Sequence, residues 1–180
     1  MSSPTDKKAK QSSSAPFDFL GEFLVKKSAS AQERDTMVRS SSLQESEAVA
    51  LYFSASWSPP CALFTPAFAR AFDILKSVKA SLSIVYIGYD EDESAWNDYC
   101  SRMPWLAVPF SRQDILDQVK KKFNITGIPR IVLLDREASL VSNNVRGGDF
   151  FSLDTSRPHV LACWKKIQKL VEQTGTALQR

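Results

Sequence analysis

Runs of apolar residues recur along the chain and predict a sheet of buried strands. Residues 48–54, 82–90 and 128–135 are nearly continuous apolar runs, as expected for strands at the centre of a sheet. Part of residues 17–27 is expected to form a first strand or an edge segment. Residues 138–149 are expected to hold another strand and a Gly-Gly turn.

Four segments are predicted as helices. The first begins near Ser58 and contains Pro66, which removes a helical hydrogen bond and should kink the axis. Its apolar face recurs at three- and four-residue spacing and consists of Cys61, Phe64, Phe68, Phe72 and Leu75. The other helices are expected at residues 91–103, 112–123 and 159–173.

The remaining segments are predicted to be irregular. Residues 28–47 are polar and are expected to form a long loop with at most a helical turn. Residues 104–110 contain two prolines and are expected to lack regular structure. We divide the chain into a flexible tail over residues 1–15, one domain over residues 16–176 and a short end over 177–180.

Composition and charge narrow the class of protein. Strands alternating with helices predict an α/β domain, and 43% hydrophobic residues suffice for its core. The net charge of 23 − 20 = +3 gives no reason to expect nucleic-acid binding, and no apolar run approaches membrane-spanning length. Three cysteines are too few for a disulfide scaffold, and no hydrophobic leader is present. We therefore expect a cytoplasmic monomer.

The stretch LYFSASWSPPCALFTP, residues 51–66, has the arrangement of a thiol-disulfide active site. A strand leads into Trp-x-Pro-Pro-Cys at a helix start, where the partial positive charge of the helix favours a thiolate. Disulfide exchange needs two sulfurs three residues apart: one attacks the substrate, and the other then releases it. In this chain Cys61 is the second of these positions, and the first is Ser58.

Three blocks of sequence resemble tryparedoxins and nucleoredoxins. They are YFSASWSPPCALFTPAF at 52–68, MPWLAVPF at 103–110 and FNITGIPRIVLLD at 123–135, and the resemblance spans roughly residues 17–165. It implies a thioredoxin-like fold, with a central mixed β-sheet flanked by helices, and an activity as a protein-disulfide reductant. Tryparedoxins take their electrons from trypanothione and pass them to peroxidases.

The resemblance also implies roles for single residues. Ser58 takes the place of the attacking cysteine and Cys61 that of the resolving cysteine, while Pro129 matches a cis-proline that faces the active site. A cis bond there would expose the backbone of Ile128 to an extended peptide. The substrate groove would consist of Trp57, Pro59, Pro60, Ile128, Pro129 and Arg130. No metal and no cofactor are implied.

Three positions depart from the family pattern. Ser58 is the most consequential, because a hydroxyl has a far higher pKa than a thiol and cannot form a disulfide. Ala62 stands where a basic residue is usual, and Arg130 stands where threonine is usual. Ser58 is either a natural divergence or an introduced change, and the companion changes favour divergence.

Two functions follow from these departures. The leading hypothesis is a protein that binds a protein partner through the retained groove and has lost dithiol exchange. The alternative is an active oxidoreductase, either with Ser58 as an introduced change or with Cys61 working as a single thiol with glutathione or trypanothione. Cys61 lies on the apolar helical face, so we expect it to be buried and slow to react.

Structural explanations compete with functional ones at several residues. Ser58 is expected to serve as an N-cap, worth roughly 1 kcal/mol to the helix. Cys100 and Cys163 lie in apolar-periodic helices and are expected in the core rather than at a metal site. His159 begins the last helix and is expected to be solvated.

Two charged runs have open interpretations. Residues 90–93, Asp-Glu-Asp-Glu, form either a solvated helix start or a source of one proton-handling carboxylate near the site. The lysines at 120–122 form either a solvated helical face or a contact for an acidic partner.

Overall fold

A computed structural model describes residues 14–179, and most of the predicted tail lies outside this range. Seven strands form one mixed sheet in the order β2-β1-β5-β4-β3-β6-β7. The strands are β1 (Phe23–Lys26), β2 (Thr36–Arg39), β3 (Ala48–Ser54), β4 (Leu82–Gly88), β5 (Leu106–Ala107), β6 (Arg130–Asp135) and β7 (Leu140–Ser142). The central strand β3 pairs parallel to β4 and antiparallel to β6.

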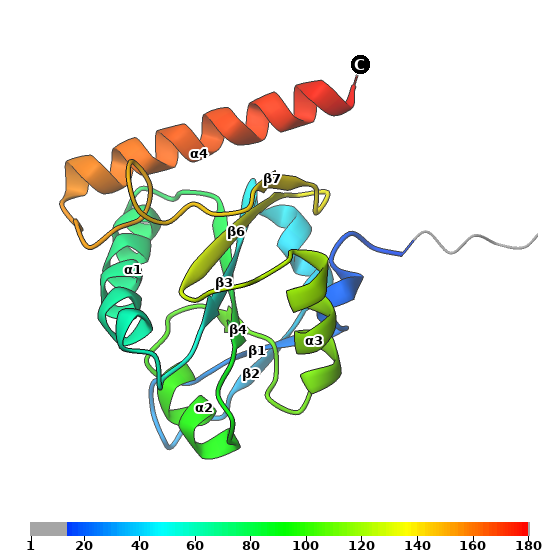
Figure 1. The fold of residues 1–180 in the computed structure, drawn as a ribbon, viewed down its shortest axis with the longest axis vertical. Helices are drawn as coiled ribbons and strands as arrows, with labels where there is room; N and C mark the ends of the chain where they lie inside the picture. The colour runs from blue at the N-terminus through cyan, green and yellow to red at the C-terminus, as the bar shows by residue number, and fades with distance from the viewer. Residues whose placement is uncertain (1–13, 180) are drawn as a thin grey trace, which may run out of the picture.

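Helices cover both faces of the sheet (Figure 1). They are α1 (Pro59–Ser77), α2 (Glu93–Cys100), α3 (Gln113–Lys122) and α4 (Arg157–Leu178), with short 3-10 helices η1 (Asp18–Leu20) and η2 (Ser40–Glu45). Helices α1, α2 and α4 pack on one face, whereas α3 and both 3-10 helices pack on the other. Within residues 14–179, no helix is long and apolar enough to cross a membrane. The predicted thioredoxin-like arrangement, a mixed sheet flanked by helices, is confirmed.

Strand β3 divides the core into two halves. All seven of its residues are buried, and successive side chains point to opposite faces of the sheet. Tyr52 therefore packs against α1, while Leu51 and Phe53 pack beneath α3. The first of these halves is rich in aromatic contacts, including edge-to-face packing of Tyr52 on Phe68 and Trp105.

Two strands and the length of the last helix differ from prediction. Strand β2 lies in the segment expected to be a loop, and β5 lies between the two prolines of the segment expected to be irregular. Strand β2 sits at the sheet edge with mostly exposed side chains, so no apolar pattern marks it. Helix α4 extends beyond residues 159–173 at both ends. Pro66 lies inside α1, as predicted.

Candidate functional site

Ser58 is the N-cap residue of α1, as predicted, but its hydroxyl makes no capping hydrogen bond. Its backbone is extended, and its carbonyl accepts the first helical bond from the N–H of Ala62 at 2.9 Å. An N-cap side chain normally accepts from the second or third helical N–H, and here Pro59 and Pro60 occupy the first two positions. Proline has no N–H to donate, and the Ser58 hydroxyl does not accept from the third helical N–H, that of Cys61, so the expected side-chain stabilisation is absent.

The two predicted catalytic positions lie on the same turn and are both covered. Cys61 has no exposed surface, as expected, and Ser58 is 5% exposed. By contrast, Trp57 is 60% exposed beside them. The first turn of α1 therefore presents an indole and two prolines to solvent, with the hydroxyl and the thiol beneath.

Neither of the other two cysteines lies on the helix that carries Cys61. The three cysteines of the chain are free and buried, and Cys100 and Cys163 lie in α2 and α4, in the core as predicted. Burial raises the pKa of the Cys100 thiol to about 12 and that of Cys163 to about 11, so both are protonated at neutral pH. An intramolecular disulfide would require Cys61 to find a partner outside its own helix.

A buried carboxylate holds the loop that carries Trp57. Asp90 is 4% exposed and accepts hydrogen bonds from the Ser56 N–H at 2.8 Å, the Ser56 hydroxyl at 2.5 Å and the Tyr86 hydroxyl at 2.7 Å. The Trp57 indole N–H donates to the Tyr89 carbonyl at 3.1 Å. The acidic run is therefore divided: Asp90 fixes the loop, while Asp92 caps α2 by accepting from Ala95.

Hydroxyl groups form a network beneath Cys61. The Thr65 hydroxyl contacts the Tyr52 hydroxyl at 2.7 Å and also hydrogen-bonds the Tyr99 hydroxyl. Tyr99 in turn donates to the Cys61 carbonyl at 3.3 Å and contacts the Ser54 hydroxyl at 2.9 Å. Burial raises the pKa of both Tyr52 and Tyr99, so these phenols stay protonated at neutral pH.

Pro129 lies at the end of β3 next to the α1 N-terminus. The Ile128–Pro129 bond is cis, as the resemblance implies, and Arg130 pairs with Phe53 in the β3–β6 register. Arg146 donates from Nε to the Pro129 carbonyl at 3.1 Å, and its guanidinium lies 5.6 Å from the ring centroid of Phe64 in α1. Arg146 thus links the segment of Pro129 to helix α1.

Arg130 is half-buried and lies near Tyr89. Burial raises the pKa of Tyr89 to about 12, and the charge of Arg130 opposes this rise. Lys120 lies over the same ring, with Nζ 3.8 Å from the ring centroid. Of the lysine run at 120–122, Lys120 therefore belongs to the neighbourhood of the groove.

His159 is not solvated as predicted. It is half-buried, and its Nε2 lies 3.1 Å from the Phe150 carbonyl, 3.2 Å from the Ser152 hydroxyl and 3.5 Å from Cys163 Sγ. The reason is the loop before α4, which folds back onto the first turn of the helix. The histidine holds this loop and takes no part in the site around Ser58.

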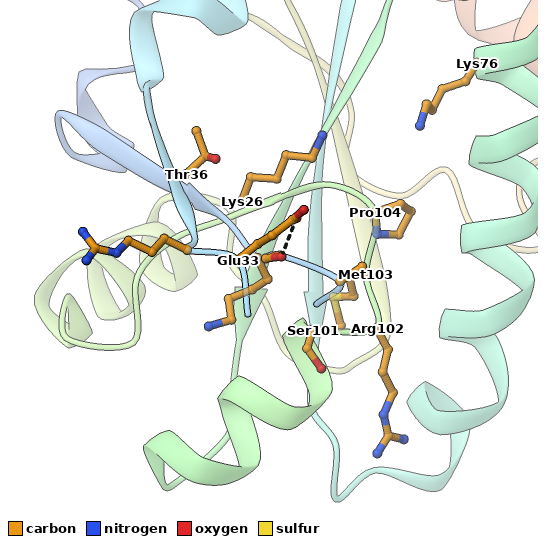
Figure 2. A pocket seen from close by; sticks show the side chains of 12 residues that line it. Lys26, Glu33, Thr36, Lys76, Ser101, Arg102, Met103 and Pro104 are labelled. Atoms are coloured by element: carbon orange, nitrogen blue, oxygen red, sulfur yellow. Dashed lines mark hydrogen bonds between the residues drawn. The ribbon is translucent and has the colours of Figure 1, made fainter. Parts of the chain in front are cut away.

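A separate hollow of about 440 Å³ lies between the segment after β1, the end of α1 and the segment after α2 (Figure 2). Its lining includes Lys26, Lys76 and Arg102, but none of the predicted groove residues. Figure 2 shows the Arg102 guanidinium directed away from Lys76, and Arg102 pairs with Asp98 at 2.7 Å. Arg102 and Lys76 therefore do not converge on one ligand.

Sequence reasoning missed Arg146, Ser56 and Tyr89 as parts of the site. A weak signal existed for the loop, because Asp90 follows directly on a buried strand where a carboxylate needs partners. Nothing marked Arg146, since its contact depends on how the segment after β7 lies against β6. Within residues 14–179, no group of three or more histidine, cysteine, aspartate or glutamate side chains could hold a metal ion.

Comparisons with known proteins agree with the geometry. The chain is 38% identical over 121 residues to probable nucleoredoxin 1 of Arabidopsis thaliana, which covers 64% of this chain and 21% of that protein. It is 38% identical over 93 residues to tryparedoxin of Trypanosoma brucei brucei, covering 52% of this chain and 64% of that one. The chain thus spans less than two thirds of the length of either relative.

Solved structures of tryparedoxins share the fold of this chain. Native tryparedoxin I from Crithidia fasciculata matches with a TM-score of 0.62 and 31% identity, covering 72% of this chain and 87% of that one. Tryparedoxin from Trypanosoma brucei matches with a TM-score of 0.60 and 30% identity over 69% of this chain and 81% of that one. A family model described as thioredoxin-like matches residues 46–140, more than half of the chain. The chain therefore belongs to the thioredoxin-like family, with tryparedoxins and nucleoredoxins among its relatives.

Proposed function

We propose that this protein binds an extended segment of a partner protein in the groove beside Pro129 and does not carry out dithiol-disulfide exchange. The observation that carries the proposal is Ser58 above a fully buried Cys61, with the other two thiols buried in other helices. Exchange requires a thiolate that attacks and a second thiol that resolves, and an alcohol does neither at neutral pH. Because all three thiols are free, a reducing compartment such as the cytoplasm suits the protein.

The groove offers an unpaired strand backbone and an apolar side chain to an extended peptide. Strand β6 begins at Arg130, so the register with β3 and β7 leaves the Ile128 backbone unpaired by either strand. An incoming extended segment can pair with this backbone as a sheet edge does. Trp57, at 60% exposure, supplies an apolar surface next to it, and Asp90 and Arg146 fix the two sides.

The single-thiol alternative demands access to Cys61. Attack on oxidised glutathione would place a glutathionyl sulfur on Cys61 Sγ and release one glutathione thiolate. Cys61 has no exposed surface and would have to emerge from beneath the first turn of α1 for this reaction. Burial therefore favours the binding function.

A reductase assay tests the proposal. The unmodified chain, Ser58→Cys and Ser58→Cys/Cys61→Ser are each supplied with dithiothreitol and a protein disulfide. We expect the unmodified chain to match the reductant alone, and Ser58→Cys to gain turnover that the double variant loses. Turnover by the unmodified chain at a rate near that of a reference tryparedoxin would overturn the proposal.

A further inference from the structure

We propose that Arg130 and Lys120, gathered around Tyr89, recognise an aspartate or glutamate side chain in the segment bound beside Pro129. The inference rests on the proposed groove and names the chemistry of its partner. It begins from Arg130, which follows Pro129 directly and departs from the threonine usual in tryparedoxins.

The position of Arg130 directs it toward α3. Ile131 packs in the half of the core beneath α1, and side chains alternate along a strand, so Arg130 lies on the α3 face of β6. It pairs with Phe53, the ring of which lies 6.4 Å from that of Tyr89. The influence of Arg130 on the Tyr89 pKa agrees with this placement.

Tyr89 brings the second cation to the same place. Lys120 Nζ lies 3.8 Å from the centroid of its ring, a cation–π contact. The Tyr89 hydroxyl is buried and has no hydrogen-bond partner among the residues that the structure describes. Since this phenol is neutral at pH 7, it leaves the charges of Lys120 and Arg130 uncompensated.

Lys120 and Arg130 combine partial burial with the absence of a counter-ion, whereas the other unpaired lysines and arginines within residues 14–179 are exposed. The ion pairs formed within residues 14–179 engage other cations, such as Lys27 with Asp35 and Arg112 with Asp114, and none includes Lys120 or Arg130. Both side chains are half-buried, and charges in that position are screened less by salt than fully exposed ones. A carboxylate is the complementary group that a protein segment carries.

Tyr89 links the two cations to Trp57. The Trp57 indole donates to the Tyr89 carbonyl, so a segment lying between Trp57 and Pro129 passes beside them. The exposed acids at residues 91–93 follow Tyr89 and would favour a lysine instead. Asp92 already caps α2, and Asp90 faces Ser56 and Tyr86, so we assign the stronger effect to the two cations.

Trapping kinetics measure this preference. The background is Ser58→Cys/Cys61→Ser, and the probes are peptides Ala-Val-X-Cys-X-Val-Ala in which the cysteine carries 5-thio-2-nitrobenzoate. The thiolate at position 58 attacks the peptide sulfur, that disulfide breaks, and the coloured nitrothiobenzoate thiolate leaves. Rates are compared for X as Glu, Gln or Lys, and a Cys61→Ser protein that retains Ser58 gives the blank.

We expect the Glu peptide to react about two- to five-fold faster than the Gln peptide at low salt, the size typical of partly exposed ion pairs. Adding Arg130→Thr should bring this ratio close to one, and Lys120→Gln should lower it. The control Lys165→Gln removes one charge from an exposed, unpaired site on α4 and should leave the ratio unchanged.

Using the ratio within each protein removes any effect of Arg130 on the reactivity of the new thiol. Equal rates for Glu and Gln, a preference for Lys, or a Glu preference that survives Arg130→Thr would each overturn the inference. None of these results depends on whether the unmodified chain turns over disulfides, so the proposed loss of exchange is judged separately.

Discussion

Arg146 donates a hydrogen bond from Nε to the carbonyl oxygen of Pro129 at 3.1 Å, across the sheet edge from the segment that follows β7. The two residues are 17 positions apart in sequence. The Val145 N–H bonds to the Ile131 carbonyl at 2.9 Å and sets the position from which Arg146 reaches. One side of the groove is therefore held by a segment that contributes no residue to the recognised motifs.

Replacing Arg146 by lysine should loosen this side of the groove. Lysine keeps the charge but lacks the Nε–H that points at the Pro129 carbonyl, so we expect a loss of about 1 kcal/mol in the free energy of unfolding. Urea denaturation measures it, and Arg136→Lys, an exposed arginine on the β6–β7 turn, serves as the matched control. Equal stability of both variants would show that the contact contributes nothing.

The Asp90 carboxylate should control the order of the Trp57 loop. Asp90→Ala leaves the Ser56 N–H and the Tyr86 hydroxyl without their acceptor, and we expect unfolding to become easier by about 2–4 kcal/mol. Amide hydrogen exchange at Ser56 should also accelerate, since its N–H is released. The neighbouring variant Glu91→Ala, at an exposed position, should change neither quantity. Slow exchange at Ser56 in Asp90→Ala would contradict this role.

The Thr65 hydroxyl should stabilise the network beneath Cys61. Thr65→Val preserves the shape of the side chain but removes the partner of the buried Tyr52 hydroxyl, at an expected cost of about 1–3 kcal/mol. Thr65→Ser keeps the hydroxyl and should lose less stability than Thr65→Val. The prediction fails if denaturation places the valine variant at or above the serine variant.

Alkaline pH should destabilise the fold through Cys100. Burial raises its thiol pKa from 9.0 to about 12, so the folded state holds the proton more tightly than the unfolded state. The stabilisation is complete below pH 9 and is lost as pH rises through about 12, at about 1.4 kcal/mol per pH unit. Buried tyrosines such as Tyr86 act in the same direction.

The Cys100→Ala variant isolates this contribution. The free energy of unfolding is measured by urea denaturation with a reductant present. Between pH 8 and pH 10.5 it should fall by about 2 kcal/mol less in the variant than in the unmodified chain. Only the change with pH is compared, because the smaller side chain also leaves a cavity. If the free energy of unfolding falls equally with pH in the two proteins, Cys100 does not contribute to the loss of stability at alkaline pH.

The strands whose bounds were predicted closely from sequence are those whose burial produces a continuous apolar run. Strand β3 has the predicted bounds, and β4 ends two residues before the predicted end. Strand β2 could not be predicted, because it pairs with β1 alone at the edge and its side chains face water. The two residues of β5 are a strand only because β1 and β4 lie on either side of them.

The same division applies to the site. Ser58 and Cys61 could be placed from the motif, because it follows a buried strand and begins a helix, whereas the site role of Pro129 was implied only by the resemblance to tryparedoxins and nucleoredoxins. The contacts of Asp90 with Ser56 and of Arg146 with Pro129 join segments far apart in sequence, and no local pattern encodes them. The two prolines after Ser58 remove the first and second helical N–H groups but leave that of Cys61, so the sequence did not decide whether the Ser58 hydroxyl caps the helix.

The bonds that hold the loop before α1 all avoid the side chain at position 58. The Ser56 hydroxyl donates to Asp90, and the Trp57 indole donates to the Tyr89 carbonyl. The Ala62 N–H donates to the backbone carbonyl of Ser58. Exchanging oxygen for sulfur there disturbs none of them. A dithiol can therefore be gained or lost on this turn by one substitution, without disturbing the bonds that position the loop.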